Sequence, residues 1–340
     1  MKQNKKNPFF IYLSTNAPHG PFNVADKYKE MYAGNPNVPN AAFWGMITNI
    51  DENMGRLMKV LDEEGLADNT LLIFTTDNGT AAGSRKGKGF NAGMKGNKGS
   101  QYDGGHRVPF LMRWPAGGLT GGRDVAKLTA HIDILPTLTE ICGLKHTPAR
   151  KLDGMSIQPL LSGKADTWPA RTLVVESQRI ETPQKGRKNS VMTDKWRLVD
   201  NKELYDMTTD PGQAKNVAAA HPEVVKSLNA HYDQWWESVS ERHGEYCPLV
   251  IGAENQGPSV ITAHDWHGQQ VPWNQRHVRS GAAGNGYWSI KVEREGHFSV
   301  ALRRWPLEVD KPIRDAHDGQ AINVQLASLK IQNFNRVQTV

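Results

Sequence analysis

The sequence predicts an α/β protein built on a mostly parallel sheet flanked by helices, and three observations support this. Short apolar runs that are typical of strands alternate with longer segments whose apolar residues recur every three or four positions. The strand-like runs are apolar on both faces, as expected for strands that helices cover on each side. The pattern changes after about residue 178, which limits this α/β part to the first half of the chain.

The elements of the first part follow in order along the chain. Residues 9–15 are predicted to form a buried strand. Residues 41–64 are predicted to form a helix, because apolar side chains from Phe43 to Leu61 recur at steps of three and four and Gly65 follows as a stop. A short helix is expected at 131–143, and further buried strands are expected at 69–76, 108–114 and 171–177.

The opening stretch has a second interpretation as a secretory signal, since three lysines precede the apolar run Phe9–Leu13. A signal needs an apolar core of about 7–15 residues, whereas this run has five before Ser14. The Pro18-His19-Gly20-Pro21 segment is also a poor cleavage region. We therefore favour a strand in mid-domain, with Met1 as an internal methionine of a longer protein.

Two further domains are expected beyond the α/β part. Residues 190–200 resemble a hairpin and residues 222–243 a helix with Pro222 at its first position, which together suggest a small antiparallel sheet backed by one helix. From about 247 the chain is expected to be an all-β, sandwich-like module, because polar and apolar residues alternate at 258–263, 286–294, 297–305 and 322–331. The predicted domains are 1–178, 179–246 and 247–340.

Composition sets only broad limits on function. The net charge of +6 is compatible with an anionic partner, but an ordinary basic surface explains it equally simply. No run approaches the roughly 18–20 apolar residues of a membrane span. Cys142 and Cys247 allow at most one disulfide and do not identify a redox compartment.

Polar residues follow two of the predicted strands, where ligands bind in open α/β sheets. The first strand leads to His19, and the second leads to Asp77 and Asn78. A carboxylate beside an amide supplies the hard oxygen ligands that Ca²⁺ or Mg²⁺ prefers. On its own, however, Asp-Asn-Gly is equally typical of a simple turn.

A glycine- and lysine-rich loop is expected at residues 83–105. Glycine lets the backbone approach a ligand closely, and lysine supplies positive charge for an oxyanion. The order Lys98-Gly99-Ser100 does not match the phosphate-loop motif, which requires Gly-Lys-Ser/Thr. A flexible basic surface loop is the alternative when this segment is considered alone.

Considered together, these segments resemble the formylglycine-dependent sulfatases of the alkaline-phosphatase superfamily over about residues 8–240. The similar stretches occur in family order: PFFIYLSTNAPHGPF, NIDENMGRLMKVLDEEGLADNTLLIFTTDNGT, KGSQYDGGHRVPFLMRWP, HIDILPTLTEICG, LDGMSIQPLLSG and ELYDMTTDPGQAKNVAAAHPE. The resemblance implies an alkaline-phosphatase-like fold and the hydrolysis of sulfate esters of aryl or carbohydrate substrates.

The resemblance also implies roles for four residues. Asp77 and Asn78 match two ligands of the Ca²⁺ ion that holds a sulfate oxygen. Lys98 matches a lysine that contacts the sulfate, and His19 matches a histidine near the ester oxygen that assists the leaving group. Arg107, which follows the loop, is expected to be structural.

The match is incomplete at the nucleophile. The family's nucleophile arises from Cys/Ser-x-Pro-x-Arg, whereas Cys142 precedes Gly-Leu-Lys-His and Cys247 precedes Pro-Leu-Val-Ile. An early Asp-Asp pair that supplies further metal ligands is also absent. The chain is therefore expected to be the carboxy-terminal part of a sulfatase, with formylglycine upstream, weak calcium binding and slow or no turnover by itself. The resemblance implies that the full-length protein is periplasmic or secreted.

Two alternatives remain at this point: a related phosphoesterase or phosphonate hydrolase, and a non-catalytic module that binds anionic glycans. In the last domain, HDWHG could bind a metal and HFSVALRRWP could contact a sugar, although both segments are equally compatible with ordinary β structure. The expected partner is a sulfate-ester small molecule or a sulfated polysaccharide, not a nucleic acid. The sequence leaves the ester and the oligomeric state open.

Overall fold

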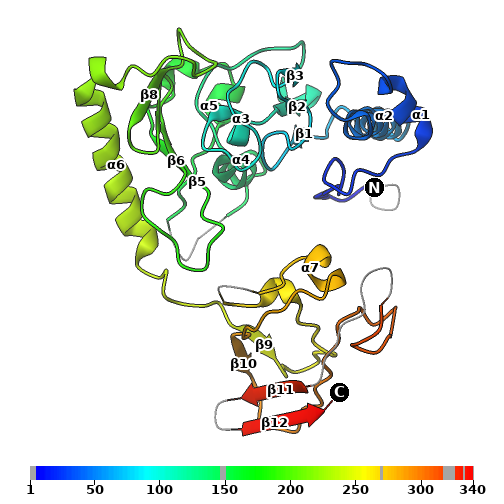
Figure 1. Cartoon of the computed structure of the whole chain (residues 1–340). Coiled ribbons are helices and arrows are strands. Elements are labelled where there is room, and N and C mark those ends of the chain that lie inside the picture. Colours follow the sequence, from blue (N-terminus) through cyan, green and yellow to red (C-terminus); the bar gives the residue numbers. More distant parts are fainter. Residues whose placement is uncertain (1–4, 146–150, 269–270, 317–325, 332–333, 340) are drawn as a thin grey trace. The chain divides into compact units, whose positions relative to one another are not determined.

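The computed structural model describes residues 5–145, 151–268, 271–316, 326–331 and 334–339. The chain divides into two compact units (Figure 1). The first comprises residues 1–178 and 184–238, and the second comprises 179–183 and 239–340. The finer division at residues 178 and 246 stays a prediction.

A long helix organises the beginning of the first unit. The helix α2 (Ala41–Glu63) confirms the one predicted from spacing, and the Asn40 side chain caps it by accepting the Phe43 amide proton at 2.9 Å. The short helix α1 (Asp26–Lys29) packs against it. This packing is close at Gly45, where a Cβ atom would lie 2.9 Å from the Tyr28 carbonyl carbon.

The predicted buried strand at residues 9–15 is wrong for this structure. The segment has no strand hydrogen bonds, and its apolar side chains are exposed, with Phe10 at 79% and Tyr12 at 83%. A strand requires a neighbouring backbone to satisfy its amide and carbonyl groups. Within the described residues no strand pairs with this segment, so its apolar pattern has no sheet to enter.

The next two predicted strands form, but they do not make a parallel sheet. Strands β1 (Leu72–Thr75) and β4 (Phe110–Arg113) are antiparallel, with Leu72 opposite Arg113. The expected mostly parallel sheet is thus corrected to a two-stranded antiparallel pair in the described chain. Apolar runs on both faces are typical of parallel strands, but they do not determine strand direction, which depends on the path of the chain between the strands.

The glycine-rich segment between these strands contains short elements. Strands β2 (Ser84–Arg85) and β3 (Lys88–Gly89) form a hairpin, and α3 (Asp103–His106) ends the segment. After β4, a short 3₁₀ turn (Pro115–Gly117) precedes the region of α4. Figure 1 shows β2 and β3 near β1, and the Gly83 amide donates a hydrogen bond to the Thr80 hydroxyl, which fixes the hairpin to the residues after β1.

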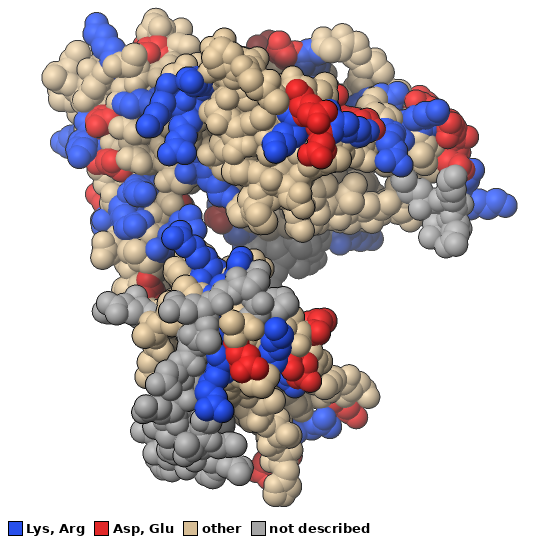
Figure 2. All heavy atoms as spheres, turned by 45° about the vertical axis from the view of Figure 1, so that its right-hand side comes forward, with Lys and Arg blue, Asp and Glu red and all other residues tan. Residues whose placement is uncertain are grey.

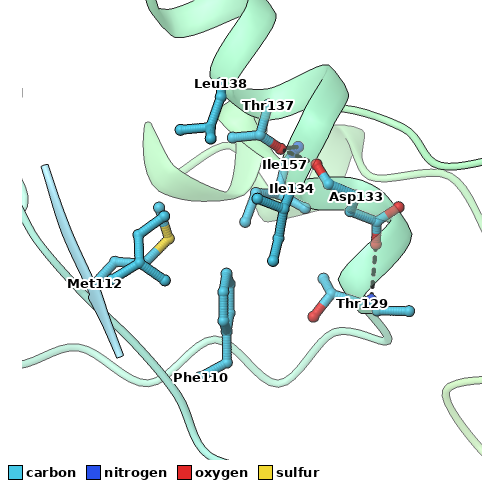
Figure 3. A pocket seen from close by; sticks show the side chains of 10 residues that line it. Phe110, Met112, Thr129, Asp133, Ile134, Thr137, Leu138 and Ile157 are labelled. Atoms are coloured by element: carbon cyan, nitrogen blue, oxygen red, sulfur yellow. Dashed lines mark hydrogen bonds between the residues drawn. The ribbon is translucent and has the colours of Figure 1, made fainter. Parts of the chain in front are cut away.

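The helix α4 (Ile134–Ile141) confirms the helix predicted at 131–143 and follows a 3₁₀ turn, His131–Asp133. The short helix α5 (Gln158–Leu161) packs against α4, and a 3₁₀ turn (Ala165–Thr167) follows it. Figure 3 shows the apolar gap between α4 and β4, lined by Phe110, Met112, Ile134, Thr137, Leu138 and Ile157. Its volume of about 10 Å³ is at the lower limit for a single water, so it is a packing gap and not a ligand site.

A four-stranded antiparallel sheet and one helix complete the first unit. The sequence predicted a small antiparallel sheet with one helix, but it assigned the strand at 171–177 to the mostly parallel sheet instead. The strands are adjacent in chain order: β5 (Leu173–Glu176), β6 (Asn189–Met192), β7 (Trp196–Val199) and β8 (Glu203–Asp206). The helix α6 (Pro222–Ser240) follows a 3₁₀ turn, Ala218–Ala220, and begins at the predicted proline. Its Leu228 and Tyr232 pack on a core with Val191, Leu198 and Leu204.

The second unit differs from the expected sandwich-like module. It has a parallel pair, β9 (Leu249–Ile251) and β10 (Ile290–Val292), and a hairpin, β11 (Leu326–Ile331) and β12 (Phe334–Thr339). It also contains the helix α7 (Gln275–Arg279) and a 3₁₀ turn, Ala263–Asp265. Residues 258–263 and 297–305, predicted as strands, are irregular, and residues 322–325 lie outside the described residues.

In the second unit, the alternation of polar and apolar residues did not indicate strands reliably, because single aromatic side chains are buried in irregular segments as well as in strands. Trp305 is buried in an irregular segment and donates its indole proton to the Asp315 carbonyl at 2.9 Å. Trp266 and Trp288 pack with ring centroids 5.0 Å apart. Such contacts produce a period-two pattern without a strand ladder.

The surface carries charges of both signs. Figure 2 shows Lys and Arg groups with Asp and Glu groups among them on the viewed face. The net charge of +6 is therefore not gathered into one uniform field on that face. Among the described residues, none of the helices combines the length and apolar content that crossing a bilayer requires.

Candidate functional site

The predicted metal-ligand pair lies in the turn that follows β1. The Thr76 hydroxyl donates to the Asn78 carbonyl at 3.2 Å, and the His131 Nε2 donates to the Thr76 carbonyl at 2.8 Å. The side chain of Asp77 is exposed, and that of Asn78 is half-buried. Two side chains thus hold the turn through its backbone carbonyl groups, and the Asp77 side chain is left exposed to solvent.

Gly79 fixes this turn against the end of the glycine-rich segment. Its amide donates to the Gly105 carbonyl at 3.0 Å. A Cβ atom at this position would lie 1.9 Å from the Gly104 carbonyl oxygen, a distance that no side chain can occupy. Glycine is therefore required here for a close backbone approach.

Lys98 lies beside the same turn. Its amide donates to the Thr80 carbonyl at 2.9 Å, and the side chain of the preceding Asn97 donates to the Ser84 carbonyl at 2.9 Å. The glycine-rich segment therefore folds back on the residues after β1. This brings Lys98 to the turn that carries Asp77, while its own side chain stays exposed.

A clamp of four side chains holds the segment that carries Lys98 to β8. The Tyr102 and Tyr205 hydroxyls donate to one Glu203 carboxylate oxygen at 2.8 and 2.6 Å. The Lys95 ammonium donates to the Tyr205 hydroxyl at 3.0 Å and lies 4.0 Å from the Tyr102 ring centroid. We call Lys95, Tyr102, Glu203 and Tyr205 the tyrosine–glutamate clamp.

The pKa values of the clamp reflect this arrangement. Burial, followed by the hydrogen bond to Glu203, raises the pKa of Tyr102 to about 12. The hydrogen bond from Tyr205 lowers the pKa of Glu203, and burial raises the pKa of Tyr205. At neutral pH both phenols of the clamp are therefore neutral, and Glu203 is a carboxylate.

A second contact with the small sheet lies at α3. The buried carboxylate of Asp103 accepts a bond of 3.0 Å from the Arg197 Nε, and its amide donates to the Gln213 side chain at 2.8 Å. Burial is the largest effect on the pKa of His106 and lowers it below its ordinary value. The charge of Asp103 opposes this shift, and the charge of Arg197 adds to it. Arg107 lies 3.9 Å from Asp103, consistent with a structural role.

His19 occupies a separate loop. Its amide donates to the Asn16 carbonyl at 2.9 Å, and its Nδ1 donates to the Gly20 carbonyl at 2.7 Å. With Thr15, Asn16 and Met46 it lines an open hollow of about 620 Å³. The other lining residues are Ala17, Gly20, Pro21 and Asn23.

Three of the four predicted residues lie in one hydrogen-bonded region of the backbone, because the Lys98 amide is bonded to Thr80, three residues after Asp77. Asp77, Asn78 and Lys98 share one backbone framework, whereas the described residues show no hydrogen bond between His19 and these three. Aromatic packing connects the loop that carries His19 with α2: the Phe22 ring packs edge-on against the Phe43 ring, with the ring centroids 5.6 Å apart. Phe43 also borders Gly83, where a Cβ atom would lie 3.0 Å from its ring.

The predicted ligand pair meets part of what a calcium ion requires. Asp77 and Asn78 offer oxygen atoms of the preferred kind, but Ca²⁺ takes 6–8 oxygen ligands. The described residues contain no group of three or more His, Cys, Asp or Glu side chains that could hold a metal ion. The described part of the chain therefore does not form a complete calcium site.

Two family models match the chain. Residues 1–144 match the model described as Sulfatase, and residues 97–237 match the model for the C-terminal part of N-sulphoglucosamine sulphohydrolase. Residues 1–237, which the two models together span, belong to the sulfatase family. This confirms the resemblance drawn from the motifs, and proteins of this family typically use Ca²⁺ and formylglycine.

Curated sulfatases match over part of their length. Mouse steryl-sulfatase is 35% identical over 171 residues, which cover 48% of this chain and 26% of the relative. Human arylsulfatase A is 29% identical over 77% of this chain and 48% of its own. An N-acetylgalactosamine-6-O-sulfatase of Bacteroides thetaiotaomicron is 29% identical over 70% of this chain and 48% of its own. The chain thus spans about a quarter to a half of these relatives.

Two solved structures share the fold over part of the chain. The structure of Ps i-CgsB in complex with k-i-k-neocarrahexaose has a TM-score of 0.59 and 26% identity, and covers 68% of this chain and 51% of that one. The putative sulfatase yidJ of Bacteroides fragilis has a TM-score of 0.54 and 24% identity, and covers 71% and 56%. The mixed α/β architecture with small sheets is therefore structurally similar to that of sulfatases.

The sequence interpretation missed the tyrosine–glutamate clamp and the Asp103–Arg197 pair. Tyr102 and Asp103 lie in the recognised segment QYDGG, and Glu203 and Tyr205 lie in KELYD, about a hundred positions later. A single sequence gives no signal for such pairing. The two histidines of HDWHG have different neighbours, because His264 packs on Trp273 whereas His267 lies 3.4 Å from Glu181.

Proposed function

We propose that this chain provides the sulfate-binding part of a sulfate-ester hydrolase that acts on aryl or carbohydrate esters. The observation that supports this best is the bond between the Lys98 amide and the Thr80 carbonyl. It fixes the backbone of Lys98 beside the turn that presents Asp77 and Asn78, and the Lys98 side chain is exposed. A cationic group beside hard oxygen ligands suits a tetrahedral oxyanion.

Each residue has a role in this proposal. The Lys98 ammonium binds a sulfate oxygen and offsets the charge that builds up there in the transition state. His19 has its Nδ1 bonded to the Gly20 carbonyl, which leaves Nε2 to donate a proton to the leaving ester oxygen. Asp77 and Asn78 would hold part of a calcium shell, and bound Ca²⁺ supplies positive charge for the sulfate.

The nucleophile and the remaining metal ligands come, in this proposal, from protein sequence outside these 340 residues. The chain itself contains no Cys/Ser-x-Pro-x-Arg segment. We therefore expect slow or no hydrolysis of p-nitrophenyl sulfate by the chain alone. Co-expression with a segment that carries this motif and its formylglycine restores hydrolysis. Clear turnover by the 340-residue chain, lost on Lys98→Ala, would contradict this assignment of the nucleophile.

Sulfate binding gives a test that does not depend on turnover. Calorimetric titration of the chain with inorganic sulfate is expected to show binding that Lys98→Ala weakens about tenfold, the effect of one charge-assisted hydrogen bond. Lys98→Arg keeps the charge and retains most of the affinity. Lys59→Ala, an exposed change on α2, serves as the control. Equal affinity in Lys98→Ala and Lys59→Ala would contradict the role of Lys98.

The absent nucleophile motif also favours a second candidate, a non-catalytic module that binds anionic glycans. Retention on heparin without hydrolysis, even after co-expression with the motif-bearing segment, would favour this candidate. Preferential hydrolysis of p-nitrophenyl phosphate by the co-expressed protein would instead indicate a phosphoesterase.

A further inference from the structure

The glycine-rich segment carries charge of one sign only. Residues 78–102 contain five basic residues and neither aspartate nor glutamate. The clamp engages Lys95, whereas the other four basic side chains make no ion pair or hydrogen bond with the part of the chain that the structure describes: Arg85, Lys86, Lys88 and Lys98. Unpaired charges of one sign attract a ligand of the opposite charge.

Three of these charges are presented on a tight hairpin. Strands β2 and β3 pair with Ser84 opposite Gly89 and Arg85 opposite Lys88, so Lys86 and Gly87 form a two-residue turn. Both turn residues have positive φ angles, 52° and 75°, as tight hairpin turns of this length require. Residues 85–90 are all exposed. The hairpin thus holds its basic groups out from the surface.

The base of the hairpin is bonded to the residues around Lys98. The Asn97 side chain donates to the Ser84 carbonyl, and the Gly83 amide donates to the Thr80 hydroxyl at 2.8 Å. The Gly89 amide donates to the Asn37 carbonyl at 2.7 Å. The tip lies two residues beyond Ser84, about 7 Å along a strand. That span is on the scale of a sugar ring.

An exposed aromatic ring follows the hairpin. Phe90 is 72% exposed, although its amide is fixed to the Gly83 carbonyl at 3.1 Å. The face of an aromatic ring is electron-rich and attracts positively polarised groups such as the C–H bonds of a sugar. A basic hairpin beside such a ring matches a ligand that has both anionic groups and sugar rings.

We propose that the hairpin Ser84–Gly89 and Phe90 form a subsite for a second sulfated sugar, adjacent to the sulfate that Lys98 binds. We call these residues the hairpin subsite. The substrate class is then a sulfated polysaccharide and not an isolated aryl sulfate. This inference rests on the proposed function, because the subsite is useful only if Lys98 binds the scissile sulfate.

The test compares a triple variant, Arg85→Ala with Lys86→Ala and Lys88→Ala, with the unchanged chain. Both are titrated with a sulfated carrageenan hexasaccharide and with inorganic sulfate. The triple variant is expected to bind the hexasaccharide at least tenfold more weakly and inorganic sulfate equally well. Phe90→Ala is expected to weaken hexasaccharide binding by a smaller factor and to leave inorganic sulfate binding unchanged. Phe90→Trp keeps an aromatic ring and is expected to bind the hexasaccharide as well as the unchanged chain does.

A matched control removes the same charge elsewhere. Lys29→Ala with Lys164→Ala and Lys226→Ala changes three exposed residues and also lowers the net charge from +6 to +3, since three positive charges are lost. This control is expected to leave hexasaccharide binding within twofold of the unchanged chain. An equal loss in both triple variants would contradict the hairpin subsite, because it would indicate a general charge effect.

The outcomes separate the two proposals. If Lys98→Ala weakens inorganic sulfate binding but the hairpin variant binds the hexasaccharide normally, the hairpin subsite is wrong and the proposed function stands. If Lys98→Ala has no effect on inorganic sulfate, the proposed function itself is wrong. A single-stranded DNA 20-mer that binds as tightly as the hexasaccharide, and loses affinity equally in the hairpin variant, would overturn selectivity for sugars.

Discussion

The amide of Lys98 donates a hydrogen bond of 2.9 Å to the carbonyl of Thr80, three residues after Asp77. Since a backbone bond does not depend on the side chain of either residue, the lysine position is fixed relative to the turn before any ligand binds. Such preorganisation lowers the entropy cost of binding. The contacts on either side of Lys98, at Asn97 and at the tyrosine–glutamate clamp, support the same geometry.

Gly79→Ala is expected to disrupt this geometry. The new Cβ atom would lie 1.9 Å from the Gly104 carbonyl oxygen, so the turn and the glycine-rich segment must separate. We expect a loss of about 1–3 kcal/mol in the free energy of unfolding, as for other overpacked sites, together with weaker sulfate binding. Chemical denaturation and calorimetry measure the two effects.

Gly55→Ala is the matched control for that variant. Gly55 lies in α2 with nothing within 4 Å of an added Cβ atom. Alanine at an exposed helix position is expected to stabilise the protein by about 1 kcal/mol. If both substitutions changed stability in the same direction, the close approach at Gly79 would not be the cause.

Glu203→Gln is expected to loosen the segment that carries Lys98. The carboxylate accepts hydrogen bonds from Tyr102 and Tyr205, and its charge offsets that of Lys95. Glutamine keeps the shape but removes the charge, so we expect weaker sulfate binding with a small loss of stability, about 1 kcal/mol. Glu203 acts here as a positioning residue, because it does not contact the ligand.

A purely structural role for Glu203 makes a different prediction. In that case unfolding free energy would fall while sulfate affinity of the folded chain stayed constant. Glu203→Asp, which keeps the charge on a shorter side chain, is expected to recover part of the affinity. Glu223→Gln on α6, an exposed acidic position, is the control for removal of one negative charge.

The sequence predicted the local elements of the first unit well and their assembly less well. The helix α2 was evident because Phe43, Met46 and Leu61 recur on one face, and all three are buried. The strands β5–β8 and the helix α6 were evident for similar reasons of period and capping. These signals depend on neighbours in the chain, which a sequence displays directly.

Strand direction and long-range pairing were not predictable in this way. An apolar run such as Leu72–Thr75 reports burial, and its antiparallel pairing with Phe110–Arg113 depends on the path of the chain between them. The segment from Phe9 to Leu13 has the same pattern but no pairing strand among the described residues, and it is exposed. For the site, motifs identified Asp77, Asn78 and Lys98, whereas the clamp was visible only in space.

Acidification is expected to destabilise the first unit through His106. Burial holds the pKa of His106 below its ordinary value of 6.5 in the folded chain, with Arg197 adding to the effect and Asp103 opposing it. In the unfolded chain the imidazole titrates near 6.5, so below that pH the unfolded state binds more protons. The contribution of His106 to the free energy of unfolding is therefore fully present above pH 6.5 and is lost as the pH falls through the folded-state pKa.

Urea unfolding at pH 7.5 and pH 5 measures this contribution. His106→Gln removes the titrating group, so the variant is expected to lose less stability than the unchanged chain between the two pH values. His297→Gln, at an exposed position in the second unit, is the control and is expected to leave the difference between the two pH values unchanged. Identical pH dependence in the unchanged chain and His106→Gln would show that His106 does not carry the effect.

The buried pair of Asp133 and Arg171 is expected to be the most sensitive ionic contact of the first unit. The Asp133 carboxylate accepts bonds from the Arg171 guanidinium and the Ala130 amide, each at 2.8 Å, and from the Met155 amide at 3.0 Å. Figure 3 shows Asp133 beside the apolar gap under α4. Arg171→Met leaves a buried carboxylate without its counter-ion and is expected to lower the free energy of unfolding by about 3–5 kcal/mol.

Lys59→Ala, which breaks an exposed pair with Glu63, is the control and is expected to lower the free energy of unfolding by at most about 0.5 kcal/mol. A cost below about 1 kcal/mol for Arg171→Met in chemical denaturation would mean that the two backbone amides alone satisfy Asp133.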